Sequence, residues 1–488
     1  MGGINYKYKY TSALPRIDEV LSSQTKMASR KYISKSSIPL LDDVNIGLVV
    51  DDVLDISILE NKFAQLIEGS PVLGGTMRCT PDSRKFRCGS TVDFEARTLD
   101  HDLNTFLPFS WQGSTEPTIL HQQFPAMDGN FMFKERGEPK PLCLLRATVL
   151  KDATLLCFSF VHGLFDGQSG FDMIRYFCDL LSNKPIPKFI LPPDANGARM
   201  SDLIRVPGGE QGPHEPPRVF VTKPLKMLKI QGKFLLEKLR ELFGLSEKLM
   251  PKLFHLPGSW VDKVRARAQM ELDSSPENII TEKSSAVQLT RNDIIAAVYL
   301  KVLYGSKRPS DGPVDLVGPI NYRGLLEPQA PGTYYNHNSI IFLRCQLSER
   351  EIQTGSVAKV AEKIRLATTQ YKHPAIVKRE VRFIEDKVPA PSLVDFRGGF
   401  KWGFVFVTPW TTFNHKGLDF SGASRNGGRT PSVVYVNPEI RLLAGTLPSP
   451  SLVTLKDGSG GYWLRGANTA SGWKAFEDCV SLEKLFTN

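Results

Sequence analysis

Three residues at fixed spacing could carry acid–base chemistry: His162, Asp166 and Gly167 form an H-x-x-x-D-G motif. Alternating residues predict a strand over 154–161, before the motif, and apolar residues at helical spacing predict a helix over 169–181, after it. The motif therefore lies in a loop between a strand and a helix, where α/β proteins often place functional groups. A neutral imidazole has a pKa of about 6.5, so near pH 7 His162 can take a proton from an alcohol. Taken alone, the motif also fits a loop histidine followed by a helix-capping aspartate.

Helices and strands are predicted in both halves of the chain, which indicates an α/β architecture with mixed sheets. The predicted helices are 56–67, 169–181, 292–303 and 356–371, and the predicted strands are 141–148, 154–161, 314–321, 340–347, 404–407, 433–436 and 462–467. We expect three parts: an N-terminal domain over 1–200 that carries the motif, a basic crossover segment over 201–257, and a C-terminal domain over 258–488.

The segment between the two halves is proline-rich at first and then basic. Over 225–250, leucines recur near helical spacing with lysines between them, which predicts a basic amphipathic helix. Our leading interpretation is a crossover helix that packs its leucine stripe on the domains. Weak contact of residues 218–267 with a membrane surface, or binding of a partner helix, are the alternatives that the sequence leaves open.

Composition and charge exclude several classes of protein. With 41% hydrophobic and 23% charged residues over 488 positions, the chain can bury sizeable cores and is not a disordered protein. The net charge is +10, but residues 218–267 hold twelve Lys and Arg against four acids, so +8 of it lies there and +2 elsewhere. We therefore expect no nucleic-acid partner.

Targeting and metal-binding signals are equally sparse in the sequence. No apolar run approaches the roughly 18 residues of a membrane span, and the first residues lack the apolar core of a secretory signal, so we expect a cytoplasmic protein. The seven cysteines contain no C-x-x-C pair, which favours reduced, buried thiols and no metal site. No P-loop or complete G-x-G-x-x-G occurs, so ATP or dinucleotide use is not indicated.

Several further segments match one family in order along the chain. Beside the motif at 162–167, they are 70–78 (SPVLGGTMR), 289–297 (LTRNDIIAA), 318–323 (GPINYR) followed by 335–338 (YNHN), 407–410 (VTPW) and 419–423 (DFSGA). With them the sequence resembles the BAHD acyltransferases, particularly fungal secondary-metabolite O-acetyltransferases of the trichothecene 3-O-acetyltransferase type. The resemblance covers nearly the whole chain. Residues 419–423 keep only the Asp-Phe opening of the family's DFGWG loop, which puts the details of the donor site in doubt.

This resemblance implies a fold and a reaction. The fold would be two chloramphenicol-acetyltransferase-like domains, with an active-site channel at their interface. The protein would be a monomeric enzyme that transfers an acyl group, most often acetyl, from acetyl-CoA to a hydroxyl of a terpenoid or polyketide metabolite. The CoA ester would be a co-substrate, and no cofactor would be bound permanently.

The resemblance also assigns roles to residues. His162 would be the general base, and Trp410 would donate its indole N–H to the oxyanion, unless it is simply a buried core tryptophan. Asp166 would turn away from the substrate and form a bidentate pair with Arg323, so that Asp166, Gly167 and Arg323 are structural at the site.

Three further residues are expected on the donor side. Thr408 is a candidate for the polar lining of the channel. Arg425 and Arg429, in a glycine-rich loop, are candidates for the CoA phosphates, although a solvated loop would explain them equally well.

Two alternatives to this function stay open. One is a condensation-domain-like transferase that takes its acyl group from a carrier protein, although such domains favour two adjacent histidines and Val161 precedes His162 here. The other is a non-catalytic, membrane-associated binding protein.

Overall fold

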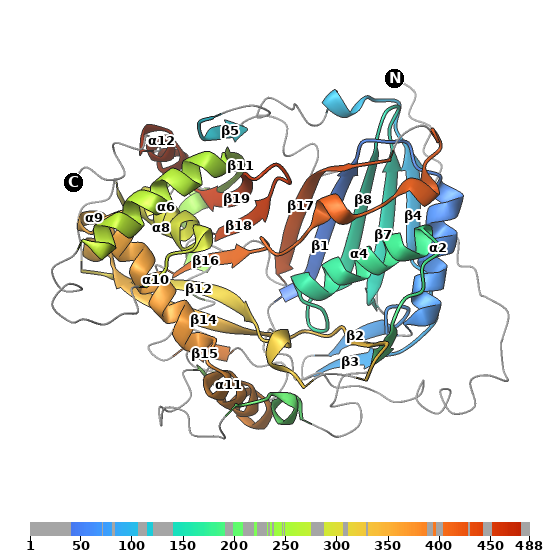
Figure 1. Ribbon diagram of the computed structural model, residues 1–488, viewed down its shortest axis with the longest axis horizontal. Helices are drawn as coiled ribbons and strands as arrows, with labels where there is room; N and C mark the ends of the chain where they lie inside the picture. The colour runs from blue at the N-terminus through green and yellow to red at the C-terminus, as the bar shows by residue number, and fades with distance from the viewer. Residues whose placement is uncertain are drawn as a thin grey trace.

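Two mixed β-sheets that exchange strands organise the protein (Figure 1). The computed structural model describes residues 41–70, 72–80, 83–105, 115–120, 140–190, 199–207, 219–221, 232, 235–236, 239–245, 247, 249–274, 287–305, 311–327, 330–387, 394–396, 404–427, 430–442 and 451–479.

The first sheet has the strand order β17-β1-β8-β7-β4 and carries helices α2 and α4 on one face (Figure 1). Its elements are β1 (Leu41–Val50), α2 (Ile56–Gly69), β4 (Phe94–Thr98), β7 (Cys143–Val149), β8 (Thr154–Val161), α4 (Gly167–Leu181) and β17 (Val433–Leu442). All neighbours are antiparallel except β4 and β7. The predicted strand 154–161 and the predicted helix that follows the motif are both present.

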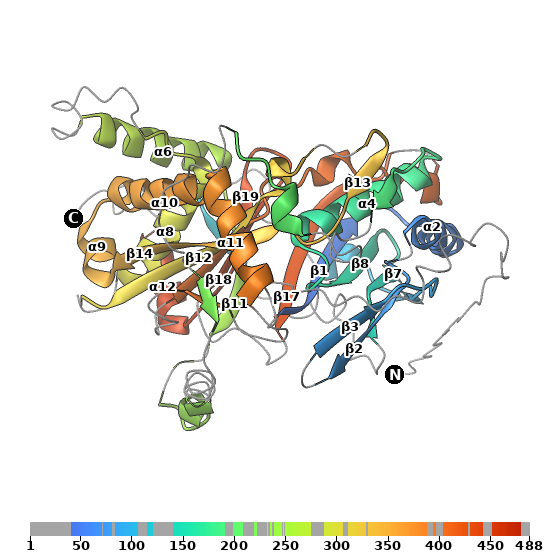
Figure 2. The same ribbon diagram turned by 90° about the horizontal axis from the view of Figure 1, so that it is seen from below.

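The second sheet has the order β14-β12-β16-β18-β19-β11-β5. Its strands are β5 (Thr118–Leu120), β11 (Met250–Leu256), β12 (Pro313–Asn321), β14 (Ile340–Ser348), β16 (Phe404–Pro409), β18 (Ser451–Lys456) and β19 (Tyr462–Asn468). Helices packed with it are α6 (Gly258–Asp273), α8 (Arg291–Gly305), α9 (Glu349–Thr354), α10 (Val357–Tyr371), α11 (Pro374–Lys387) and α12 (Ala470–Cys479). Figure 2 shows α6, α10 and α8 stacked on this half of the molecule.

Short elements complete the described chain. They are β2 (Thr76–Thr80), β3 (Ser83–Arg87), β6 (Lys140–Pro141), β9 (Lys188–Ile190), β10 (Val219–Val221), β13 (Thr333–Tyr335) and β15 (Val394–Phe396), with 3-10 turns η1 (Leu103–Thr105), η3 (Met200–Leu203), η4 (Arg323–Leu325), η5 (His415–Gly417) and η6 (Ser421–Ala423).

The two halves exchange strands, so neither sheet is built from one continuous stretch of chain. β17, from the last sixty residues, pairs with β1 at the edge of the first sheet, while β5, from the first half, pairs with β11 in the second. β11 itself falls in the segment 201–257 that we expected to be a crossover. The division at 200 and 257 stays a prediction, because the sheets show where strands pair and not where a domain begins.

A shared apolar core joins the two sheets. Successive residues of β8 point to opposite faces: Leu156, Phe158 and Phe160 pack under α2 and α4, whereas Leu155 and Cys157 face Leu253 and Trp463 of the second sheet. All eight residues of β8 are therefore buried. This double burial holds the carboxyl end of β8, where the motif begins, in a fixed position.

The prediction that the basic segment packs a leucine stripe on the domains is wrong for its described residues. Positions 232, 235, 236 and 239–242 are helical, but the apolar side chains there are largely in solvent: Leu235 (63% exposed), Leu236 (56%), Leu239 (41%), Leu242 (77%), Phe243 (71%) and Leu245 (69%). The helical period was recognised, but nothing in the sequence shows whether a body of the protein lies against it. The stretch 222–231 lies outside the described residues.

The remaining expectations from the sequence concern the cysteines, membrane-spanning helices and metal sites. Cys143, Cys157, Cys178 and Cys345 are buried, and Cys88 is half-buried. Among the described residues, no helix is long and apolar enough to cross a membrane. No cluster of three or more His, Cys, Asp or Glu side chains in the described ranges is arranged to hold a metal ion.

Candidate active site

The H-x-x-x-D-G loop is held from both sides of the molecule. Leu164 N–H and Phe165 N–H both donate to the carbonyl of Val161, which turns the chain sharply after β8. From the second half, Asn338 N–H donates to Leu164 O at 2.7 Å and the Asn338 side-chain amide donates to His162 O at 3.0 Å. The YNHN segment thus fixes the backbone of the residue expected to be the base.

His162 is 4% exposed and borders a cavity. Its Nδ1 is buried without a hydrogen bond to any described residue, so Nε2 is the nitrogen that can face the cavity. Burial lowers the pKa of His162, against weaker opposing contributions from nearby backbone and from the charges of Asp166 and Asp43. The imidazole is therefore neutral at pH 7, as a proton acceptor must be.

Asp166 faces away from His162 and caps α4. Its Oδ1 accepts from the Ser169 N–H at 2.8 Å and from Ser169 Oγ at 2.9 Å, while the Ser169 hydroxyl accepts from the Asp166 N–H, which forms a capping box. Its Oδ2 accepts from Arg323 Nη2 at 3.0 Å and from the Ser339 N–H at 2.8 Å. Burial alone would raise the pKa of Asp166, but Arg323 and these donors outweigh it and lower the pKa.

The pair between Asp166 and Arg323 is present but is not bidentate, contrary to our expectation. Arg323 uses only Nη2, which also donates to His337 O at 2.6 Å. Oδ1 of Asp166 is already occupied by Ser169, so the second arm of the guanidinium has no carboxylate oxygen to meet. The Asp166 side chain is 2% exposed and the Arg323 side chain 14% exposed, and the pair ties the motif to the 3-10 turn after β12.

Trp410 lies against Gly167 at the start of α4. A Cβ on Gly167 would come within 2.9 Å of Trp410 Cε2 and 3.1 Å of its Nε1, so only glycine allows the ring this position. Trp410 N–H donates to Thr454 O at 2.7 Å, and Phe413 packs on the indole with ring centroids 5.0 Å apart. The indole ring lines the same cavity as His162.

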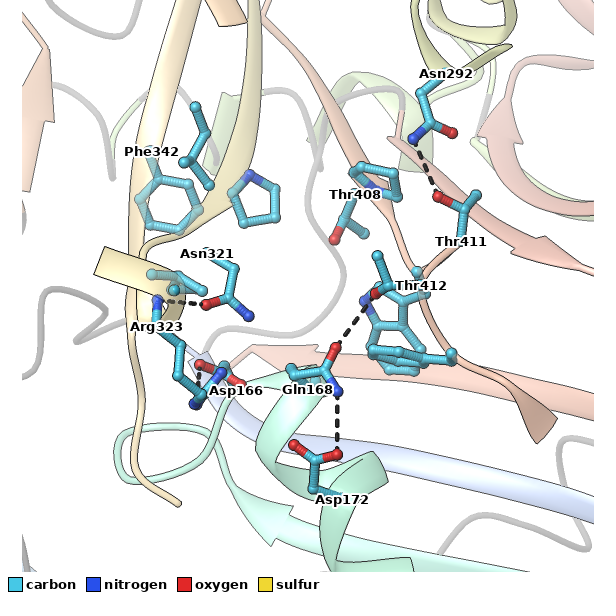
Figure 3. A pocket seen from close by; sticks show the side chains of 18 of the residues that line it. Asp166, Gln168, Asp172, Asn292, Asn321, Arg323, Phe342, Thr408, Thr411 and Thr412 are labelled. Atoms are coloured by element: carbon cyan, nitrogen blue, oxygen red, sulfur yellow. Dashed lines mark hydrogen bonds and ion pairs between the residues drawn. The ribbon is translucent and has the colours of Figure 1, made fainter. Parts of the chain in front are cut away.

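The cavity has a volume of about 610 Å³ and opens between the two sheets (Figure 3). It is lined by the predicted residues His162, Asp166, Gly167, Arg323, Thr408 and Trp410, together with Gln168, Asp172, Asn292, Pro319, Ile320, Asn321, Gly324, Tyr334, Ile340, Phe342, Lys372, Phe406, Pro409, Thr411, Thr412 and Phe413. Residues more than 240 positions apart therefore meet here, and Thr408 is buried in the wall as a polar group.

Arg425 lies elsewhere. It is half-exposed, its Nε stands 3.5 Å from Asp55 Oδ2 beside the start of α2, and it does not line the cavity. Arg429 lies outside the described residues. Geometry gives no support to the CoA contact expected for Arg425, and the contacts expected for both arginines stay predictions.

The DFSGA loop has a structural task at the other end of α4. Asp419 accepts from the Ser421 N–H at 2.9 Å and from Ser182 Oγ at 3.3 Å. Gly422 lies so close to Leu181 O that a Cβ would be 2.0 Å from it. The loop thus supports α4 from its C-terminal end and does not border the cavity.

Sequence reasoning missed several polar residues of the cavity wall. Gln168 and Asp172 stand four apart on α4 just after the motif, so their shared helix face was a usable signal. Asn292, at the start of α8, and Tyr334 and Lys372 carry no such signal, because they reach the cavity only through tertiary packing.

Comparisons with known proteins agree with this geometry. The chain is 40% identical to the acetyltransferase peniE of Penicillium patulum, over 94% of this chain and 99% of that protein. No family model matches. The fold is similar to that of F. sporotrichioides TRI101 complexed with coenzyme A and T-2, with a TM-score of 0.65 and 14% identity over 92% of this chain and 96% of that one. It is also similar to that of vinorine synthase, with a TM-score of 0.58 and 12% identity over 96% of this chain and 95% of that one. The predicted α/β architecture is thereby confirmed.

Proposed function

Because the chain belongs to the BAHD-type family of acyltransferases, we propose that it transfers the acetyl group of acetyl-CoA to a hydroxyl of a small terpenoid or polyketide metabolite, with His162 as general base. The observation that carries this proposal is the position of His162: a buried, neutral imidazole on a cavity shared by both sheets, with its partner Asp166 turned away into an ion pair.

The proposed reaction needs one proton acceptor and one oxyanion donor. His162 Nε2 takes the hydroxyl proton as the alcohol oxygen attacks the thioester carbonyl, and a C–O bond forms. The resulting tetrahedral oxyanion accepts a hydrogen bond from the Trp410 indole N–H, a donor that does not ionise. The C–S bond then breaks, and the imidazolium returns its proton to the CoA sulfur.

Donor and acceptor classes are proposed from the relatives. The relative peniE is named an acetyltransferase, and TRI101 binds coenzyme A and T-2, which supports acetyl-CoA as donor and a compact hydroxylated metabolite as acceptor. The cavity offers a cation for an anionic donor in Lys372, which lines it. The kinship to a named acetyltransferase favours this donor over an acyl group held by a carrier protein.

Release of free thiol from acetyl-CoA tests the proposal. The purified protein is incubated with acetyl-CoA and a panel of hydroxylated terpenoids and polyketides, with His162→Ala alongside. We expect acceptor-dependent release that falls by about a hundredfold to ten-thousandfold in His162→Ala, the size of a general-base contribution. Trp410→Phe keeps the bulk but removes the N–H donor, and we expect a loss of about a hundredfold in turnover. Near-normal turnover of His162→Ala, with its fold intact by circular dichroism, would exclude the base.

We propose in addition that the basic segment contacts an anionic membrane surface. Its exposed apolar residues from Leu235 to Leu245 stand clear of the molecule, and the surrounding residues 218–267 carry a net charge of +8, twelve cations less four acids. Glu247 anchors the end of this stretch, since it accepts from the Ser471 N–H and hydroxyl.

Sedimentation with vesicles tests the membrane contact. We expect pelleting with phosphatidylserine vesicles in 0.1 M salt, little with phosphatidylcholine, and loss in a Leu242→Ser, Phe243→Ser double variant. Leu366→Ser, an exposed leucine on α10, is the matched control. Equal recovery of all three proteins in the supernatant would exclude the contact.

A further inference from the structure

A chain of hydrogen bonds crosses the cavity wall and centres on Asp172. Gln168 Nε2 donates to Asp172 Oδ1 at 3.2 Å, one helical turn earlier on α4 (Figure 3). The Tyr334 hydroxyl of β13 donates to Asp172 Oδ2. Thr412, after β16, donates to Gln168 Oε1 at 3.2 Å. Asp172 is thus held by two donors, one of which Thr412 fixes in turn, although the acyl-transfer steps above do not use it.

The Asp172 carboxylate keeps unused hydrogen-bonding capacity. Two ionised oxygens offer about four lone-pair sites, and Gln168 and Tyr334 occupy two of them. The charged partner Arg175 stands 3.7 Å from Oδ1 and is itself half in solvent. The side chain is only 11% exposed, and burial raises the pKa of Asp172 against the effect of these donors. A ligand that shielded Asp172 from water and offered no hydrogen-bond donor would leave a charged carboxylate oxygen without a partner.

The cavity has opposite electrical character at its two ends. Figure 3 shows Asn292 at one end and Asp172 at the other, on either side of Arg323 and Thr408. Burial raises the pKa of Asp293, and the charges of Arg365 and Lys372 oppose that rise, so Lys372 belongs to the Asn292 end. The phosphates of a CoA ester favour Lys372 over the Asp172 end, where the charges of Arg175 and Arg323 are opposed by the carboxylate. The acceptor is left with the Asp172 end.

We propose that Asp172 is a specificity-determining residue that accepts a hydrogen bond from a second hydroxyl of the acceptor, so that the enzyme prefers diols to single alcohols. The inference rests on the proposed function, since it needs an acceptor whose first hydroxyl lies at His162. It goes beyond that function because it names the part of the acceptor that the protein recognises.

The spacing along α4 sets the scale of that acceptor. Asp172 follows the N-cap Asp166 by six residues, so it lies on the order of 9 Å further along the helix axis. His162 lies in the turn that leads into this N-cap, so the two hydroxyls sit on a scaffold several bonds across, held with its apolar body against Phe342, Phe406 and Phe413. Such a scaffold fits a polycyclic or extended metabolite better than a short alcohol.

Matched acceptors test the assignment. From the panel above, each diol that the wild type acetylates is compared with its mono-O-methyl ether, blocked at the hydroxyl that is not acetylated. For the wild type we expect kcat/KM to be about tenfold to a hundredfold higher for the diol, the size of one hydrogen bond to a charged group. Asp172→Asn, which keeps the shape, should lose most of this preference through a raised KM for the diol. The change in its kcat/KM for the ether reports any general effect of the substitution on the cavity, and the loss for the diol should exceed that change by about tenfold or more.

A second residue on the same helix supplies the control. Asp179→Asn removes an equal charge from α4 at a position that does not border the cavity, and it should leave the preference intact. Asp172→Ala, tested beside it, guards against an asparagine that still accepts the hydrogen bond. Thermal unfolding of all three variants reports any loss of fold.

The outcomes separate the two proposals. Wild-type transfer with equal rates for diol and ether overturns the role of Asp172 and leaves the proposed function standing. So does a preference that survives in both Asp172 variants. If the wild type acetylates no member of the panel, the proposed acceptor class fails, and the Asp172 assignment fails with it.

Discussion

Replacing Gly167 with alanine is the sharpest probe of how the motif positions Trp410. Gly167 is the first residue of α4, and its backbone is helical, so alanine is compatible with the local conformation. The new methyl group would stand 2.9 Å from Cε2, 3.0 Å from Cζ2 and 3.1 Å from Nε1 of Trp410. The indole cannot yield freely, because it is 5% exposed and packed on Phe413.

The expected magnitudes follow from these contacts. Overpacking a core costs about 1–3 kcal/mol, whereas alanine gains up to about 1 kcal/mol over glycine in a helix. The free energy of unfolding should therefore fall by about 0–2 kcal/mol. Turnover should fall further, by about tenfold to a hundredfold, because displacing the indole N–H by up to about 1 Å misaligns it with the oxyanion.

A double-mutant cycle is the decisive assay. Phenylalanine at 410 lacks the indole N–H and the outer part of the benzo ring that carries Cζ2, so Gly167→Ala should cost less stability, and little further turnover, in a Trp410→Phe background. Urea unfolding and kcat for acetyl transfer are measured for the wild type, both single variants and the double variant. Gly232→Ala, at a position with no atom within 4 Å of the added Cβ, is the control.

The reasoning is refuted if Gly167→Ala loses the same stability and the same turnover whether residue 410 is tryptophan or phenylalanine. Such additivity would mean that the glycine serves the turn or the helix start and not the indole.

Two further predictions concern charge. Asp166→Asn leaves Arg323 buried without its carboxylate and should lower the free energy of unfolding by about 3–5 kcal/mol. The acid limb of the pH–rate profile should move to lower pH, because a charge that favours the imidazolium of His162 is lost. A variant that is fully stable in urea unfolding but inactive would instead place Asp166 in the chemistry. Burial lowers the pKa of His337 and of His415 to about 4 each, so the folded state binds fewer protons than the unfolded state below pH 6.5. The free energy of unfolding should therefore fall by on the order of 3 kcal/mol per histidine as the pH drops from 6.5 to 4. Equal free energies of unfolding at pH 7 and pH 4.5 would contradict this.

Local sequence patterns predicted the elements that carry the site. The strand ending at Val161, the capping Asp166 and the helix after it are encoded between Thr154 and Leu181, by alternation, by a helix-capping aspartate and by a helical apolar period. The order of motifs along the chain also singled out Arg323, which the structure brings to Asp166. These features depend on near neighbours in the chain, and near neighbours are what a sequence displays directly.

The tertiary structure alone decided the features that depend on distant segments. Three features depend on what else occupies the neighbouring space. They are the exchange of β5 and β17 between the sheets, the hydrogen bond from a single nitrogen of Arg323 to Asp166, and the exposure of Leu242. The sequence shows that Arg425 is a cation and that Tyr334 is a phenol, but only packing puts the first beside Asp55 and the second on Asp172. The physical reason is that hydrogen-bonding capacity belongs to a residue, whereas the partner that satisfies it is selected when the whole chain closes around it.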